Sequence, residues 1–153
     1  MRRRKYVSSA RGGNSRFLQG DYMVFNHDKY VGKKRPHYRS GWEHAFMRFC
    51  DNNPNVIKWA SECVKIPYRD PFTGKARNYV PDFFVVYKTK HNKIRAEIVE
   101  IKPKKQSIVE SKQRNAEREV VANNHAKWTA AQQWCKQQGL IFRVVTEEDI
   151  FKK

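Results

Sequence analysis

Two apolar segments with a short polar stretch between them constrain the fold of this chain most strongly. Residues 83–87 and 94–102 are the best strand candidates, and residues 88–93 between them have the polarity and length of a hairpin connection. We expect the two segments to pair as antiparallel strands around a turn near His91. The numbers of paired residues then sum to about 182.

Charged side chains interrupt these apolar segments. Asp82 follows Pro81 at the start of the first segment, and a proline inside a sheet implies a bend that re-aims a side chain. Glu100 and Lys102 lie two residues apart on the second segment, so they project from one face. A buried carboxylate is costly unless it is protonated, paired or open to a cleft. In the expected register, Asp82 lies opposite Glu100.

Two facing carboxylates repel each other unless a cation lies between them, and oxygen ligands without His or Cys are those that Mg²⁺ prefers. Asp82 and Glu100 therefore suggest a magnesium site. Lys102 would place an ammonium beside a metal-bound water and a scissile phosphate, which points to phosphodiester hydrolysis. The alternative is a buried ion cluster in which Lys102 neutralises both acids without a metal.

The first part of the chain after residue 39 is expected to hold a helix and then short strands. Apolar residues at three- and four-residue spacing predict a helix that begins after Ser40 and ends near Asn53. Short β-like runs follow at 56–60 and 63–68, and turn residues then precede another run from Tyr79. A meander of neighbouring strands is the expected arrangement.

The last part is expected to return to the sheet through a helix. Pro103 ends the strand, and 107–138 is a long helical stretch that breaks near Asn123 in one interpretation, with Gly139 as its C-cap. Residues 140–145 form a final strand candidate. The order of elements predicts a single α/β domain with a mixed β-sheet flanked by helices.

Positive charge is concentrated at the front of the chain. The sequence has 32 Lys and Arg against 15 Asp and Glu, a net charge of +17, and residues 1–39 hold 11 of the basic residues against two acidic ones. This excess predicts a polyanionic partner, whose phosphates the Lys and Arg side chains would contact. Residues 1–38 lack a helical or strand period, so we expect a basic extended arm. Its aromatic side chains either stack on bases or pin the arm to the domain.

Composition excludes several other classes of protein. A hydrophobic content of 39%, with 4 Trp, 7 Tyr and 9 Phe, is too high for a disordered basic tail. No apolar stretch approaches the ~20 residues of a membrane span, so we expect no membrane partner and a cytoplasmic location. Three widely spaced cysteines argue against a disulfide framework or a structural zinc site.

The charged positions resemble a known motif. Pro81-Asp82 followed by Glu100-Ile101-Lys102 is similar to the PD-(D/E)xK nuclease motif, and residues 39–43, Arg-Ser-Gly-Trp-Glu, resemble the RSxxE entry of transposase endonuclease subunits and of phage head completion nucleases. The resemblance to phage head completion nucleases covers nearly the whole chain. It continues through residues 29–32, 66–68, 79–83 and 101–103, and through the end of the chain from 127–128 to 146–147.

This resemblance implies a restriction-endonuclease-like domain over residues 39–153 that cuts DNA with Mg²⁺, for which Mn²⁺ can substitute. It implies Asp82 and Glu100 as metal ligands, a metal-bound carbonyl from Ile101, and Lys102 as the catalytic lysine.

It also implies that Glu43 is a further acid of the active site. Ser40 and Glu43, however, also match a capping box, in which the glutamate reaches back to the Ser40 amide. Both interpretations stay open at this point.

Basic residues on four segments are candidates for DNA contacts. They lie in the arm, at the start of the first helix, after the active-site strand and on the late helix: Arg2, Arg3, Arg4, Lys33, Lys34, Arg35, Arg39, Lys104, Lys105 and Lys127. A solvated charge run is the alternative for Lys104 and Lys105.

The family is associated with processing or sealing the ends of packaged DNA during virion assembly. The resemblance therefore implies phage head, portal or neck proteins as partners, a host-cytoplasmic location and incorporation into the virion, and it leaves a homodimer open. Two rival functions remain. One is a transposase-type or junction-resolving endonuclease, and the other is a DNA-binding structural plug without turnover.

Overall fold

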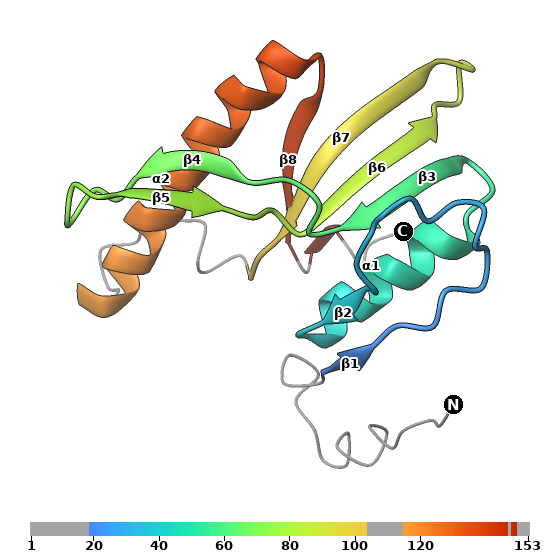
Figure 1. The fold of residues 1–153 in the computed structure, drawn as a ribbon, viewed down its shortest axis with the longest axis horizontal. Helices are drawn as coiled ribbons and strands as arrows, with labels where there is room; N and C mark the ends of the chain where they lie inside the picture. The colour runs from blue at the N-terminus through green and yellow to red at the C-terminus, as the bar shows by residue number, and fades with distance from the viewer. Residues whose placement is uncertain (1–18, 104–114, 147, 150–153) are drawn as a thin grey trace.

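The centre of the computed structural model, which describes residues 19–103, 115–146 and 148–149, is a four-stranded mixed sheet (Figure 1). Its strand order is β3-β6-β7-β8, with bounds β3 Val56–Ser61, β6 Phe83–Lys88, β7 Ile94–Ile101 and β8 Ile141–Val145. The first three strands are antiparallel, and β8 runs parallel to β7. The expected α/β fold with a mixed sheet is confirmed.

The β6–β7 hairpin has the predicted register. Phe83 lies opposite Val99 and Phe84 opposite Ile98, so paired numbers sum to 182. The register places Asp82, one residue before β6, at the level of Glu100. β6 lies between β3 and β7 and is therefore a central strand, as its apolar run predicts.

β4 (Ile66–Arg69) and β5 (Ala76–Tyr79) form a separate two-stranded hairpin, so the expectation of a simple meander is wrong. A tight turn closes this hairpin, because the Asp70 carboxylate accepts the backbone N–H of Phe72 at 2.8 Å and Gly74 has a φ of +73°. Tyr79 ends β5 opposite Ile66, rather than beginning a strand. The hairpin packs on α2, and β3 pairs with β6 instead of β4.

Helix α1 (Gly41–Asn52) covers one face of the sheet (Figure 1). It begins where the sequence predicts, because Ser40 has extended backbone and its hydroxyl accepts the N–H of Glu43 at 3.1 Å. The buried side of the helix joins the sheet in one core through Phe46, Met47 and Cys50.

Helix α2 (Asn115–Gln138) packs on the opposite face, where Trp128 and Ala131 join Ile66 and Tyr79 in a second core. The helix continues without a break through Asn123, and the first part of the predicted helical stretch lies outside the described residues.

Gly139 ends α2 with a φ of +76°, and the N–H of Leu140 bonds the Cys135 carbonyl at 2.8 Å. No helix in the part of the chain that the structure describes is long and apolar enough to cross a membrane. All three cysteines are free thiols.

The described part of the predicted arm packs onto the domain. β1 (Gly20–Asp21) pairs with β2 (His37–Tyr38), and Tyr22 and Tyr38 are buried in the first core. These two aromatic residues therefore pin the segment, whereas Phe25 is 76% exposed. The division between an arm at 1–38 and a domain at 39–153 stays a prediction.

Candidate active site

Asp82 lies at the corner between the β4–β5 hairpin and the central sheet. Its Oδ2 accepts the backbone N–H of Ile101 at 2.8 Å, which ties the start of β6 to the end of β7. The Asp82 carbonyl accepts the N–H of Glu62, at the end of β3, at 2.9 Å. Three neighbouring strand ends therefore fix this acid.

Glu100 is buried near the end of β7, with 5% of its surface exposed. Its Oε1 accepts the Tyr79 hydroxyl at 2.7 Å, and its Oε2 lies 3.5 Å from the Lys102 ammonium. The spacing of Glu100 and Lys102 on one strand predicts this proximity. Lys102 stays partly exposed, with 26% of its side chain accessible, so its ammonium can also reach a substrate.

Glu43 combines features of both interpretations of the sequence. Its backbone N–H bonds Ser40, and its Oε1 accepts the backbone N–H of Arg39 at 2.9 Å, one residue earlier than the expected Ser40 amide. The carboxylate nevertheless lies close enough to Asp82 and Glu100 for each charge to affect the others. Glu43 therefore caps α1 and also borders the acidic pair.

Mutual repulsion makes this acidic cluster electrostatically unfavourable by itself. Burial raises the pKa of Asp82 well above its usual value, and the charges of Glu100 and Glu43 raise it further. Burial also raises the pKa values of Glu100 and Glu43, although Lys102 partly offsets the effect on Glu100. A cation at this position would stabilise all three carboxylates in their charged form.

Lys127, on α2, lies beside the same cluster. Its ammonium is 5.7 Å from the centre of the Tyr79 ring and 6.0 Å from that of Tyr68. Burial lowers the pKa of Lys127, repulsion from Lys102 lowers it further, and Glu100 opposes both effects. The structure thus brings a second lysine to the acids, although the sequence predicts it only as a DNA contact.

The donor set fits Mg²⁺. Within the described residues, no three His, Cys, Asp or Glu side chains form a ready-made metal cage. Mg²⁺ usually binds through one or two carboxylates, water and substrate phosphates, so a pair of acids is enough. Among the described residues, Oδ1 of Asp82 has no hydrogen-bond partner, and Asp82 and Glu100 offer the hard oxygen donors that the ion prefers.

The predicted DNA-contact residues are only partly described. Arg2, Arg3, Arg4, Lys104 and Lys105 lie outside the described residues. Four further candidates are exposed between β1 and α1, namely Lys33, Lys34, Arg35 and Arg39.

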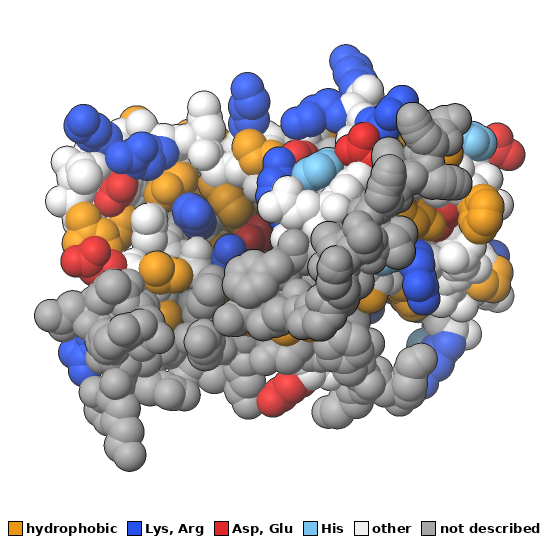
Figure 2. Space-filling model, turned by 90° about the horizontal axis from the view of Figure 1, so that it is seen from below, with side chains coloured by type: hydrophobic (Ala, Val, Ile, Leu, Met, Phe, Trp, Pro, Cys, Tyr) orange, Lys and Arg blue, Asp and Glu red, His pale blue; other side chains and the backbone are white. Residues whose placement is uncertain are grey.

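A hollow near the middle of one face shows acidic side chains at its base with basic ones beside them (Figure 2). More basic side chains line the edge of this face where Figure 1 places β4 and β5. The described part of this face presents positive charge beside recessed acidic side chains, which suits a phosphate backbone.

Sequence reasoning missed Tyr79 and Glu62. Tyr79 has no local signal of function, because only the folding of the β4–β5 hairpin onto α2 brings its hydroxyl to Glu100. Glu62 has a φ of +50°, which is rare for a glutamate and depends on tertiary contacts. The only hint in the sequence is its place directly after an apolar strand.

Comparison with known proteins agrees with this geometry. A family model described as the N-terminal domain of TnsA-like endonucleases matches residues 53–147, a range that includes Asp82, Glu100 and Lys102 but not Glu43. The chain is also 32% identical over 142 residues to the head completion nuclease of Enterobacteria phage T4, with 86% of this chain and 92% of that protein covered.

The fold and the matched family define the chain as a TnsA-like endonuclease of the PD-(D/E)xK superfamily. Within that class, it belongs to the phage head completion nucleases.

Proposed function

We propose that this nuclease cuts DNA in a Mg²⁺-dependent reaction at Asp82, Glu100 and Lys102. The observation that carries the proposal is the acidic cluster of Asp82, Glu100 and Glu43. Burial raises the pKa values of Asp82 and Glu100, the charges of Glu100 and Glu43 raise that of Asp82 further, and Lys102 lies 3.5 Å from Glu100. An ion cluster without a metal is less favourable, because Glu43 adds a third acid to this pair.

Asp82 and Glu100, with the Ile101 carbonyl, would hold Mg²⁺, which would polarise the phosphate and lower the pKa of a bound water. The chain's own side chains position the reactants. Lys102 directs its ammonium toward the phosphate and the attacking water, where it offsets developing negative charge. Tyr79 keeps the Glu100 carboxylate in one orientation through its 2.7 Å hydrogen bond.

Glu43 and Lys127 border this group on either side in the proposed complex. Glu43 adds negative charge toward the metal position, while its contact with the Arg39 amide fixes its side chain. Lys127 adds positive charge on the side of α2, where it would contact a non-bridging phosphate oxygen.

We further propose that the natural substrate is the end of packaged phage DNA during virion assembly, with head, portal or neck proteins as partners. The support is the relative from phage T4, whose name is head completion nuclease. On this proposal the protein acts in the host cytoplasm and enters the virion. DNA contacts would come from the exposed basic residues between β1 and α1, including Lys33 and Arg35, and from the basic residues at the start of the chain, Arg2, Arg3 and Arg4.

Asp82→Ala tests the proposal, with Asp28→Ala as a control because Asp28 is an exposed acid outside the cluster. Cleavage of linear duplex DNA is measured with Mg²⁺, and binding of the same DNA is measured in EDTA. We expect Asp82→Ala to abolish cleavage and to keep salt-sensitive binding. Loss of binding and of the thermal unfolding transition together would instead make Asp82 a folding residue.

A further inference from the structure

Glu62 occupies a fixed position beside the candidate active site. It directly follows β3 in a left-handed conformation, with a φ of +50°. Its backbone N–H donates a 2.9 Å hydrogen bond to the carbonyl of Asp82. Burial and the charge of Glu100 raise the pKa of Glu43, and the charge of Glu62 raises it further. The Glu62 carboxylate therefore lies close to the acidic cluster.

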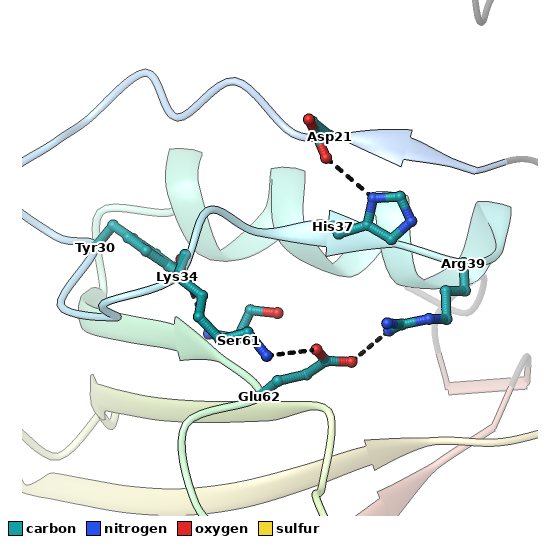
Figure 3. A network of polar contacts seen from close by, with 7 residues as sticks. All are labelled: Asp21, Tyr30, Lys34, His37, Arg39, Ser61 and Glu62. Carbon is teal, nitrogen blue, oxygen red and sulfur yellow. Dashed lines mark hydrogen bonds and ion pairs between the residues drawn. The ribbon is translucent and has the colours of Figure 1, made fainter.

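Two cations from one segment converge on this carboxylate (Figure 3). The Lys34 ammonium lies 3.5 Å from Oε1 of Glu62, and the Arg39 guanidinium donates to Oε2. The side chains of Lys34 and Arg39 are 66% and 54% exposed, whereas that of Glu62 is only 20% exposed. Both cations therefore face solvent around one anionic group.

The segment that carries these cations is well anchored. The Tyr30 hydroxyl donates to the Lys34 carbonyl at 2.6 Å, and the Arg39 N–H donates to Glu43. Tyr30 itself packs edge-on against the buried Trp59. The backbone would therefore hold both cations near the site even when their contact with Glu62 is broken.

We infer that Lys34 and Arg39 form a binding position for a backbone phosphate of DNA next to the scissile one, and that Glu62 holds this position until the phosphate displaces it. The inference rests on the proposed function, because it assumes that DNA occupies the adjacent site.

The exchange is favourable on general grounds. Exposed ion pairs contribute little to stability, so the contacts with Glu62 arrange the cations without making them unavailable. A phosphate can accept two hydrogen bonds from Arg39 in place of its single contact with Oε2 of Glu62. Phosphate binding also releases counterions from the DNA, which the contact with Glu62 does not.

Glu62→Gln tests the inference, since the amide keeps the size of the side chain and removes its charge. Binding of a short duplex is measured in EDTA, where no cleavage occurs. We expect affinity to rise about threefold to fivefold, because the phosphate no longer has to displace the Glu62 carboxylate from Lys34 and Arg39. The size of the gain is that of an ordinary surface ion pair.

Asp28→Asn is the matched control. It removes the same charge from the same segment, at an exposed position for which no ion pair is found among the described residues. We expect Asp28→Asn to change affinity less than Glu62→Gln does, and an equal gain in both variants would overturn the inference.

A double-mutant cycle separates displacement from simple repulsion. In a background with Lys34→Gln and Arg39→Gln, we expect Glu62→Gln to have no effect on affinity. A gain that persists in this background would overturn the inference, since Glu62 would then only repel DNA. Unchanged or weaker binding of the single variant would overturn it too. If the wild-type chain does not bind DNA at all, the proposed function itself is wrong.

Discussion

The hydroxyl of Tyr79 donates a 2.7 Å hydrogen bond to Oε1 of Glu100 and so joins the end of β5 to the end of β7. Burial raises the pKa of Glu100, while Lys102 and this hydrogen bond act in the opposite direction. The β4–β5 hairpin is therefore part of the wall of the candidate site, and Tyr79 is the contact through which it acts on the acid.

Replacement of Tyr79 by phenylalanine removes this contact with little change in packing. We expect kcat/KM for DNA cleavage to fall about 10- to 100-fold, because a ligand carboxylate loses the partner that orients it. Tyr87→Phe is the control, since the Tyr87 hydroxyl on β6 donates to Glu97, which lies on β7 like Glu100 but away from the acidic cluster. Equal losses in the two variants would contradict a specific role for Tyr79.

Replacement of Lys127 by methionine tests the second lysine. Methionine keeps an unbranched stem against Tyr68 and Tyr79 but has no charge, so we expect about a tenfold fall in kcat/KM with little change in the melting temperature. Arginine at this position should restore part of the activity. Lys136→Met, on the exposed surface in the last turn of α2, is the control and should leave cleavage unchanged. Activity of Lys127→Met at the wild-type level would remove Lys127 from the site.

The buried Asp51 predicts a pH-dependent stability. Burial alone would raise its pKa, but hydrogen bonds from the Phe25 amide, the Tyr22 hydroxyl and Asn26 outweigh burial and hold the pKa below its usual value. A depressed pKa in the folded state adds stability above the unfolded value of about 3.9, and this stability is lost as the pH falls through the folded value.

Asp51→Asn should therefore lower the free energy of unfolding by about 1 to 3 kcal/mol at pH 7. The difference from wild type should shrink as the pH falls below about 4. Urea unfolding at several pH values measures both effects, with Asp28→Asn as a control at an exposed acid between β1 and β2. A difference that stays constant down to pH 2 would show that the Asp51 charge does not stabilise the fold.

Deletion of residues 1–18 tests the role of the front of the chain in DNA binding. A longer deletion to residue 37 would remove Tyr22 from the core and confuse folding with binding. The six Lys and Arg residues among the first 18 should steepen the dependence of log affinity on log salt concentration. We expect the deletion to reduce this slope by about one unit per lost phosphate contact. An unchanged slope would place the phosphate contacts elsewhere.

The local features of the site follow from the sequence. The hairpin register follows from two strands and one short polar turn, so the position of Asp82 opposite Glu100 is predictable. Glu43 is ambiguous in the sequence because a capping glutamate and an active-site glutamate can occupy one position, and the structure combines the two.

Contacts between residues that lie far apart in the sequence cannot be predicted in the same way. Tyr79 and Lys127 reach the acids only after the β4–β5 hairpin folds onto α2, a contact that no periodicity encodes. The front segment lacks a regular period because Asp51 holds it through individual hydrogen bonds rather than through a repeating apolar face. The sequence alone therefore leaves open whether Tyr22 stacks on bases or packs on the domain, and the structure places it in the core.

Cleavage of supercoiled plasmid by the wild-type protein and by Lys102→Ala, each with Mg²⁺ and with EDTA, tests the central claim most directly. Lys88→Ala, at the far end of β6, controls for the loss of one positive charge. We predict nicking or linearisation by the wild type and by Lys88→Ala with Mg²⁺, and none with EDTA or with Lys102→Ala. Cleavage in EDTA, or cleavage by Lys102→Ala at the wild-type rate, would contradict the proposed chemistry, and tight binding without cleavage would favour a structural plug.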